Sequence, residues 1–259
     1  METLLKRVLG PAQLKPHYVD VLMRRMDLYE QAFTAKSYDP KRNYEIFETL
    51  GDAAANNFVT WYFFRRYPQL NCTEGVKVLA RLKINYSSKV TFSRIADKLG
   101  FWPYIRASEE QKRSDKRSLL EDVLESFVAV TIMILDEEFA IGVGFNVVYD
   151  ILKHSFDEIP VSLEYEDLYD PKSRLKELFD ARKSELGEWI QENIPVTINR
   201  QKLHQTTYYR KLRSGEKIRI GYGTGRKKID SEQVASQEAL EVLKKAGYTR
   251  KVDYSVICE

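Results

Sequence analysis

The chain lacks the features that mark most secreted and membrane-spanning proteins. Only two of its 259 residues are cysteines, Cys72 and Cys258, which are too few for a disulfide framework or a zinc site of the usual spacing. No N-terminal segment has the apolar core of a signal peptide, and no stretch approaches the roughly 20 apolar residues of a membrane span. The sequence therefore predicts no membrane association and a reduced, intracellular location, with the cytoplasm favoured and nuclear and organellar locations left open.

The chain also has little net charge, but that charge is unevenly distributed. The formal net charge is only +3. Residues 156–192 contain 5 basic and 11 acidic side chains, whereas residues 200–251 contain 14 basic and 5 acidic ones. The basic excess near the C-terminus indicates a region that could bind a polyanion.

The hydrophobic pattern divides the chain into two predicted domains. In residues 1–154, apolar positions recur at intervals of three and four, which predicts helices throughout. The acidic run 155–170 contains a proline and is predicted to be a linker. In the second domain, residues 171–259, the predicted elements are helix 171–188, strands 194–199, 206–212 and 217–222, and helix 227–245. The predicted fold is therefore mainly α: an all-helical domain followed by a small α+β domain of order α-β-β-β-α.

Two pairs of acids are set into apolar helical segments. Within the segment FETLGDAAANN, Glu48 and Asp52 are four residues apart and share one helix face. Within SLLEDVLESFVAVTIMIL, Asp122 and Glu125 are three residues apart and also share a face. A buried carboxylate is costly unless it is paired or binds a metal. If the two helices packed side by side, with Gly51 allowing a close approach, the four acids would meet.

Four converging carboxylates cannot all stay ionised unless cations neutralise them. Mg²⁺ and Mn²⁺ prefer oxygen ligands, and a pair of such ions is suited to phosphodiester cleavage by an activated water. The alternative interpretation is that each pair of acids lies on a solvated helix face, which is the common case for this spacing.

Three collinear blocks resemble the ribonuclease III family. The first block, AFTAKSYDPKRNYEIFETLGDAAANNF (32–58), is similar to the family signature Glu-x-x-Glu-x-Leu-Gly-Asp. The second is LARLKINYSSKVTFSRIADKLGFWPYIR (79–106), and the third is LLEDVLESFVAVTIMILDEEF (119–139), which resembles the motif Asp-x-x-Glu on a long helix. The resemblance covers nearly all of residues 25–152.

This resemblance implies a metal-dependent endonuclease that acts on double-stranded RNA. The family's four metal-binding carboxylates fall on Glu48, Asp52, Asp122 and Glu125. An additional acid, associated with substrate handling and the dimer interface, falls on Glu45. Members are homodimers that use Mg²⁺, with Mn²⁺ as a possible substitute, and their products carry 5′ phosphates and short 3′ overhangs.

The first domain departs from the family pattern at three positions. Thr49 replaces the usual aromatic residue, Ala35 stands where histidine is frequent, and Ala129 replaces a frequent glycine. These positions concern packing, the dimer and the RNA groove more than the metal chemistry.

The second domain resembles a double-stranded RNA-binding domain. Residues 171–178 are similar to the first helix of that domain, and His204 to its loop histidine. The resemblance implies that Glu177 and His204 contact minor grooves, and that Lys227 and Lys228 bind phosphates at a helix N-terminus. By this resemblance a third lysine of the family is replaced by Ser231. Taken singly, the histidine and the lysines are equally typical of a solvated surface.

Three functions are compatible with these features. The first is a dimeric endoribonuclease for double-stranded RNA, which the four acids favour. The second is a non-catalytic or weakly catalytic RNA-binding protein, as an RNA-silencing suppressor or an assembly subunit on the same fold. The third is sequestration of small interfering duplexes with cleavage as a by-product.

Overall fold

The structure is a computed structural model that describes residues 1–250 and 252. The chain forms two compact units, one from Met1 to Val161 and the other beginning at Ser162. Cys258 and the predicted end of the second domain lie outside the described residues. The predicted linker 155–170 contains the last residues of one helix and a short helix of its own.

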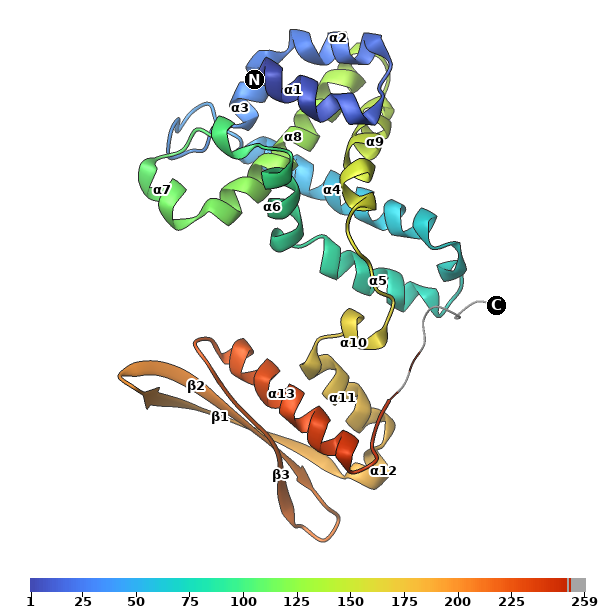
Figure 1. The fold of residues 1–259 in the computed structure, drawn as a ribbon, viewed down its shortest axis with the longest axis vertical. Helices are drawn as coiled ribbons and strands as arrows, with labels where there is room; N and C mark the ends of the chain where they lie inside the picture. Colours follow the sequence, from blue (N-terminus) through green and yellow to red (C-terminus); the bar gives the residue numbers. More distant parts are fainter. Residues whose placement is uncertain (251, 253–259) are drawn as a thin grey trace. The chain divides into compact units, whose positions relative to one another are not determined.

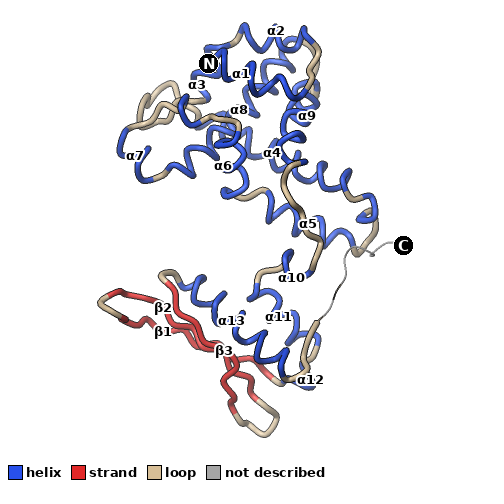
Figure 2. The backbone as a smooth tube through the Cα atoms, viewed as in Figure 1, coloured by secondary structure: helices blue, strands red, loops and turns tan. Residues whose placement is uncertain are grey.

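Every named element of the first unit is a helix (Figures 1 and 2). The helices are α1 (Glu2–Leu9), α2 (Pro16–Arg24), α3 (Met26–Ala32), α4 (Glu45–Arg66), α5 (Gly75–Tyr86), α6 (Lys89–Lys98), α7 (Glu109–Ser114), α8 (Lys116–Glu138) and α9 (Val143–Asp157), with short 3₁₀ turns at Gly10–Ala12, Pro68–Leu70 and Trp102–Tyr104. The prediction of an all-helical first unit is confirmed.

Helix α8 forms the centre of this unit. From Val123 to Thr131 every residue of α8 is buried, because α2, α3, α4, α6, α7 and α9 all pack against it. Asp122 and Glu125 lie where this buried rod begins, which is the position that their sequence context predicts. In the described part of the chain, no helix has the length and apolar character needed to cross a membrane.

Helices α4 and α8 come into backbone contact at Gly51. A Cβ atom placed on Gly51 would lie 1.8 Å from the carbonyl oxygen of Glu125, which is a severe overlap with the backbone of α8. Only glycine fits between the two helices at this point, so the predicted close approach at Gly51 is confirmed. The contact brings the acid-bearing turns of both helices together.

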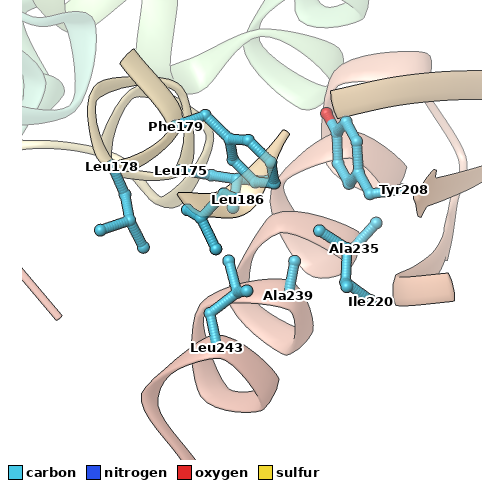
Figure 3. Close-up of a cluster of buried hydrophobic side chains, with 9 residues drawn as sticks. All are labelled: Leu175, Leu178, Phe179, Leu186, Tyr208, Ile220, Ala235, Ala239 and Leu243. Carbon is cyan, nitrogen blue, oxygen red and sulfur yellow. The ribbon is translucent and has the colours of Figure 1, made fainter. Parts of the chain in front are cut away.

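The second unit is a three-stranded antiparallel sheet with helices against it. Its elements are α10 (Tyr165–Leu168), α11 (Pro171–Ala181), α12 (Lys183–Leu186), β1 (Glu188–Ile198), β2 (Gln201–Lys211), β3 (Lys217–Gly225) and α13 (Lys228–Lys245), and the strand order is β1-β2-β3. Figure 3 shows the core that joins α11, α12 and α13 to the sheet. Its members are Leu175, Leu178, Phe179, Leu186, Tyr208, Ile220, Ala235, Ala239 and Leu243. The predicted α-β-β-β-α order is confirmed.

The first strand begins earlier than predicted. Strand β1 begins at Glu188, where the sequence predicted the end of a helix. Gly187 adopts a φ of +79°, which ends α12 and starts the strand. Trp189 then stacks on Tyr208 with ring centroids 5.3 Å apart, so tertiary packing determines the start of the strand. Pro195 is tolerated within β1 because this strand lies at the edge of the sheet.

Candidate active site

Helix α4 carries three of the predicted site residues. Glu45 is exposed and forms an ion pair with Lys36 at 3.1 Å, and Glu48, one turn later, is half-buried. Asp52 is exposed and accepts a hydrogen bond from Asn56 Nδ2 at 2.8 Å. Asp52 is therefore more open to solvent than Glu48, although its charge still acts on Glu125 of α8.

Helix α8 carries the other two predicted acids in a less accessible position. Glu125 is only 6% exposed, although no hydrogen bond or ion pair with a described residue neutralises its carboxylate. Asp122 is half-buried and accepts a hydrogen bond from the hydroxyl of Tyr44, with 2.8 Å between the phenolic oxygen and Oδ2. Tyr44 is itself buried and directly precedes α4, so the chain just before α4 is tied to the acid on α8.

The acids of the two helices lie close enough to perturb one another. Burial raises the pKa of Glu125 to about 8, and the negative charges of Glu121, Asp52, Asp122 and Glu48 add to the shift. Burial also raises the pKa of Glu48, with further contributions from Asp122 and Glu45. The pKa of Asp122 is raised by burial, while the hydrogen bond from Tyr44 opposes that shift. All four predicted acids thus influence one electrostatic centre, which we call the acid centre (Glu48, Asp52, Asp122 and Glu125).

The acid centre suits a hard cation by the kind and charge of its donors. Carboxylates from α4 and α8 act on one another at a partly buried place where burial and like charges raise the pKa values of three of them, and a divalent cation would relieve that repulsion. Among residues 1–250 and 252, however, no three Asp, Glu, His or Cys side chains are grouped so that they could hold a metal ion. The carboxylates repel one another, and two of them are turned to other partners, Asp52 to Asn56 and Asp122 to Tyr44.

Three residues beside the acid centre were not predicted from the sequence. Tyr44 positions Asp122, as described above. Glu121 precedes Asp122 on α8 and forms an ion pair with Lys89 of α6 at 2.6 Å. The side chain of Glu121 is 16% exposed, and its charge raises the pKa of Glu125, Asp122 and Glu48. Nothing in the local sequence pairs these residues, because Lys89 and Glu121 meet only through the packing of α6 on α8.

His204, Lys227 and Lys228 lie at one end of the second unit. His204 is exposed, but it lies in strand β2 rather than in the loop that the resemblance implied. It is paired with Gly225 at the end of β3, and α13 begins shortly afterwards. Both lysines are exposed at the N-terminus of α13, where free backbone N–H groups and the helix dipole favour anions.

Glu177 and Ser231 have other surroundings. The carboxylate of Glu177 accepts a hydrogen bond from the hydroxyl of Tyr165 at 2.7 Å and forms an ion pair with Arg250 at 3.0 Å. Ser231 is fully buried and its hydroxyl lies 2.8 Å from that of Thr206. A lysine at position 231 would point into the domain, so Ser231 does not replace a phosphate-binding lysine.

The sequence matches a family model at the residues that form the acid centre. The model described as "Ribonuclease III domain" matches residues 45–134, a range that contains all four acids of the centre.

Similar proteins come from viruses and from bacteria. A protein of Frog virus 3 (isolate Goorha) named "Putative ribonuclease 3" is 40% identical over 242 residues, which are 93% of this chain and 62% of the relative, so the chain spans less than two thirds of that relative. A protein of Invertebrate iridescent virus 6 with the same name is 37% identical, over 84% of this chain and 78% of the relative. The "Ribonuclease 3" of Lactobacillus acidophilus is 29% identical, over 88% of this chain and 95% of the relative.

Proposed function

The chain belongs to the ribonuclease III family, whose members are hydrolytic endoribonucleases, and from that membership we propose that it cleaves double-stranded RNA. The proposed products carry 5′ phosphates and short 3′ overhangs, as the family resemblance implies. The observation that carries the proposal is the acid centre, where residues from α4 and α8 meet beside the backbone contact at Gly51.

A divalent metal is a general requirement of the family, and Mg²⁺, with Mn²⁺ as a substitute, is the proposed cofactor. Its ligands would be Glu48, Asp52, Asp122 and Glu125. When bound, the metal supplies an activated water and stabilises negative charge that develops on the phosphate. The chain's own residues provide the site: Tyr44 orients Asp122, and the buried setting of Glu125 excludes water from one side.

A homodimer is the proposed assembly, with Glu45 near the interface. Helix α4 exposes two apolar side chains after Glu45: Ile46 is 59% exposed and Leu50 is 49% exposed. These residues are four positions apart and share one helix face. A dimer that used this face of α4 would cover both side chains, and sedimentation of the intact chain would test the assembly.

The second domain is the proposed RNA-binding module. We assign catalysis to residues 1–154 and RNA binding to residues 171–259, with residues 155–170 as the linker. His204, Lys227 and Lys228 are exposed at one end of the module and are available to an RNA duplex. Glu177 would have to exchange its bonds to Tyr165 and Arg250 for an RNA contact. An intracellular, cytoplasmic location stays a prediction from the sequence.

The decisive experiment is cleavage of a long RNA duplex by the intact chain with Mg²⁺ or Mn²⁺. We expect Glu125→Gln to lower the cleavage rate by more than roughly 100-fold, since it removes a metal ligand from a site that the metal must neutralise. The matched control is Glu137→Gln on the same helix, because Glu137 is exposed and paired with Arg25. A native chain that binds duplex RNA but cuts it with neither metal would replace the proposed function by non-catalytic RNA binding.

A further inference from the structure

A groove between α6 and α8 lies beside the acid centre in the first unit. It is lined by Val90, Ser93, Arg94 and Asp97 from α6 and by Lys116, Arg117 and Leu120 from α8. Val90 is 56% exposed at the groove although it is apolar, and Leu120 closes the floor. The groove therefore combines an apolar floor with three cationic side chains and a single acid.

Two of the three cations in this groove are unneutralised. Lys116 forms an ion pair with Asp97 at 3.1 Å and lies over the ring of Trp102, so its positive charge is already compensated. Arg94 and Arg117 are exposed, and their guanidinium groups form no ion pair or hydrogen bond with any residue that the structure describes. The only acid of the groove is already bound to Lys116, which leaves two guanidinium groups to receive an external anion.

The groove leads to the acid centre through the Lys89–Glu121 ion pair. Lys89 precedes Val90 at the start of α6, and Glu121 lies one helical turn after Arg117 on α8. With a rise of about 1.5 Å per residue, Arg117 lies roughly 7.5 Å along the axis of α8 from Asp122. One strand of duplex DNA carries a phosphate about every 3.4 Å of axis, and the spacing in an RNA duplex is no wider, so a strand that reaches the acid centre has further phosphates within range of the groove.

We propose that this groove binds the backbone of the RNA strand next to the scissile phosphate, through Arg94 and Arg117. The inference rests on the proposed function and adds two binding residues to it. Guanidinium groups bind phosphate oxygens in bidentate fashion, and the apolar floor can accommodate the sugar edge. The ion pair of Lys89 with Glu121 lies between the cationic groove and the carboxylates of the acid centre.

The test compares two double variants of the intact chain. Arg94→Gln with Arg117→Gln removes two charges from the groove, and the control Lys77→Gln with Lys83→Gln removes two exposed charges from α5. For each protein we would measure the Kd for a defined RNA duplex as a function of salt, using Glu125→Gln as the common background so that the duplex stays intact. Cleavage kinetics would then be measured without that background substitution.

We expect the groove variant to bind roughly tenfold more weakly and to lose about two from the slope of log Kd against log salt, one for each lost phosphate contact. Its KM should rise while kcat changes little, and its Tm should match that of the native chain. Equal effects in the α5 control, or an unchanged salt slope, would overturn the proposal. Binding is measured without cleavage. If the native chain failed to cut RNA, the proposed function would be lost, but the Kd values would still decide whether the groove binds the RNA backbone.

Discussion

The acid centre holds its charges partly buried, whereas the second unit holds Lys227 and Lys228, which we call the lysine end, in solvent. At the acid centre, like charges are gathered on two helices that touch at Gly51, and Glu125 is 6% exposed. At the lysine end, Lys227 and Lys228 project into solvent from the start of α13. Buried like charges destabilise the fold until a counter-ion arrives, whereas exposed charges cost little and act through salt-dependent attraction. The two regions should therefore respond differently to pH, metal and salt.

Glu125→Gln is expected to stabilise the metal-free protein, and this change in stability is the largest of the effects expected at the two regions. The folded pKa of about 8 exceeds the ordinary glutamate value of 4.5, so the folded state binds the proton more tightly. The native chain therefore loses stability as pH rises from about 4.5 to about 8, and the variant loses only the smaller part that comes from Glu48 and Asp122, whose pKa values are also raised. At pH 8 we expect the variant to be more stable by roughly 4 kcal/mol, with little difference near pH 4.5.

Denaturant unfolding with a chelator present, at several pH values, measures this difference. Asp20→Asn on α2 is the control, because Asp20 is exposed. Adding Mg²⁺ should reverse the order, since a ligand that binds the native fold stabilises the protein that binds it better. A variant less stable than the native chain at pH 8 without metal would show that the buried carboxylate of Glu125 does not destabilise the metal-free fold.

Tyr44→Phe is expected to weaken metal binding with little effect on stability. The change removes only the hydroxyl that donates to Asp122 Oδ2, and loss of such a supporting hydrogen bond lowers metal affinity by roughly tenfold, or about 1.4 kcal/mol. Titration calorimetry with Mn²⁺ reports the affinity directly. Tyr62→Phe is the matched control, because Tyr62 donates to Asp157, which lies outside the acid centre. Equal Mn²⁺ affinities for the two variants would exclude a positioning role for Tyr44.

The sequence predicted the parts of both regions that depend on local spacing. Glu48 and Asp52 share a helix, Asp122 and Glu125 begin a buried one, and Gly51 allows the two helices to touch, as predicted. The difference in exposure between Glu48 and Asp52 could not be predicted, because it depends on how the neighbouring helices cover each turn of α4. Tyr44 and Asp122 are 78 positions apart, so no local pattern could pair them.

The lysine end was predicted less accurately because its geometry depends on one turn. Asn199 and Arg200 both have positive φ angles, 49° and 64°, and they form a two-residue turn without glycine. This tight turn extends β2 back to Gln201, which places His204 inside a strand. Two-residue turns with positive φ angles usually contain glycine, which makes them recognisable in a sequence. Because this turn has no glycine, a longer loop was expected.

The smallest expected effect concerns the lysine end. Replacing Lys227 and Lys228 by glutamine should weaken binding to an RNA duplex by about 1 kcal/mol at moderate salt, and the slope of log Kd against log salt should fall by about two. The matched control replaces Lys244 and Lys245 at the other end of α13, where the helix dipole favours cations and disfavours phosphate. Fluorescence anisotropy at several salt concentrations separates the two variants. If both pairs changed the slope equally, RNA attraction would come from net charge alone, and the helix N-terminus would have no special part in it.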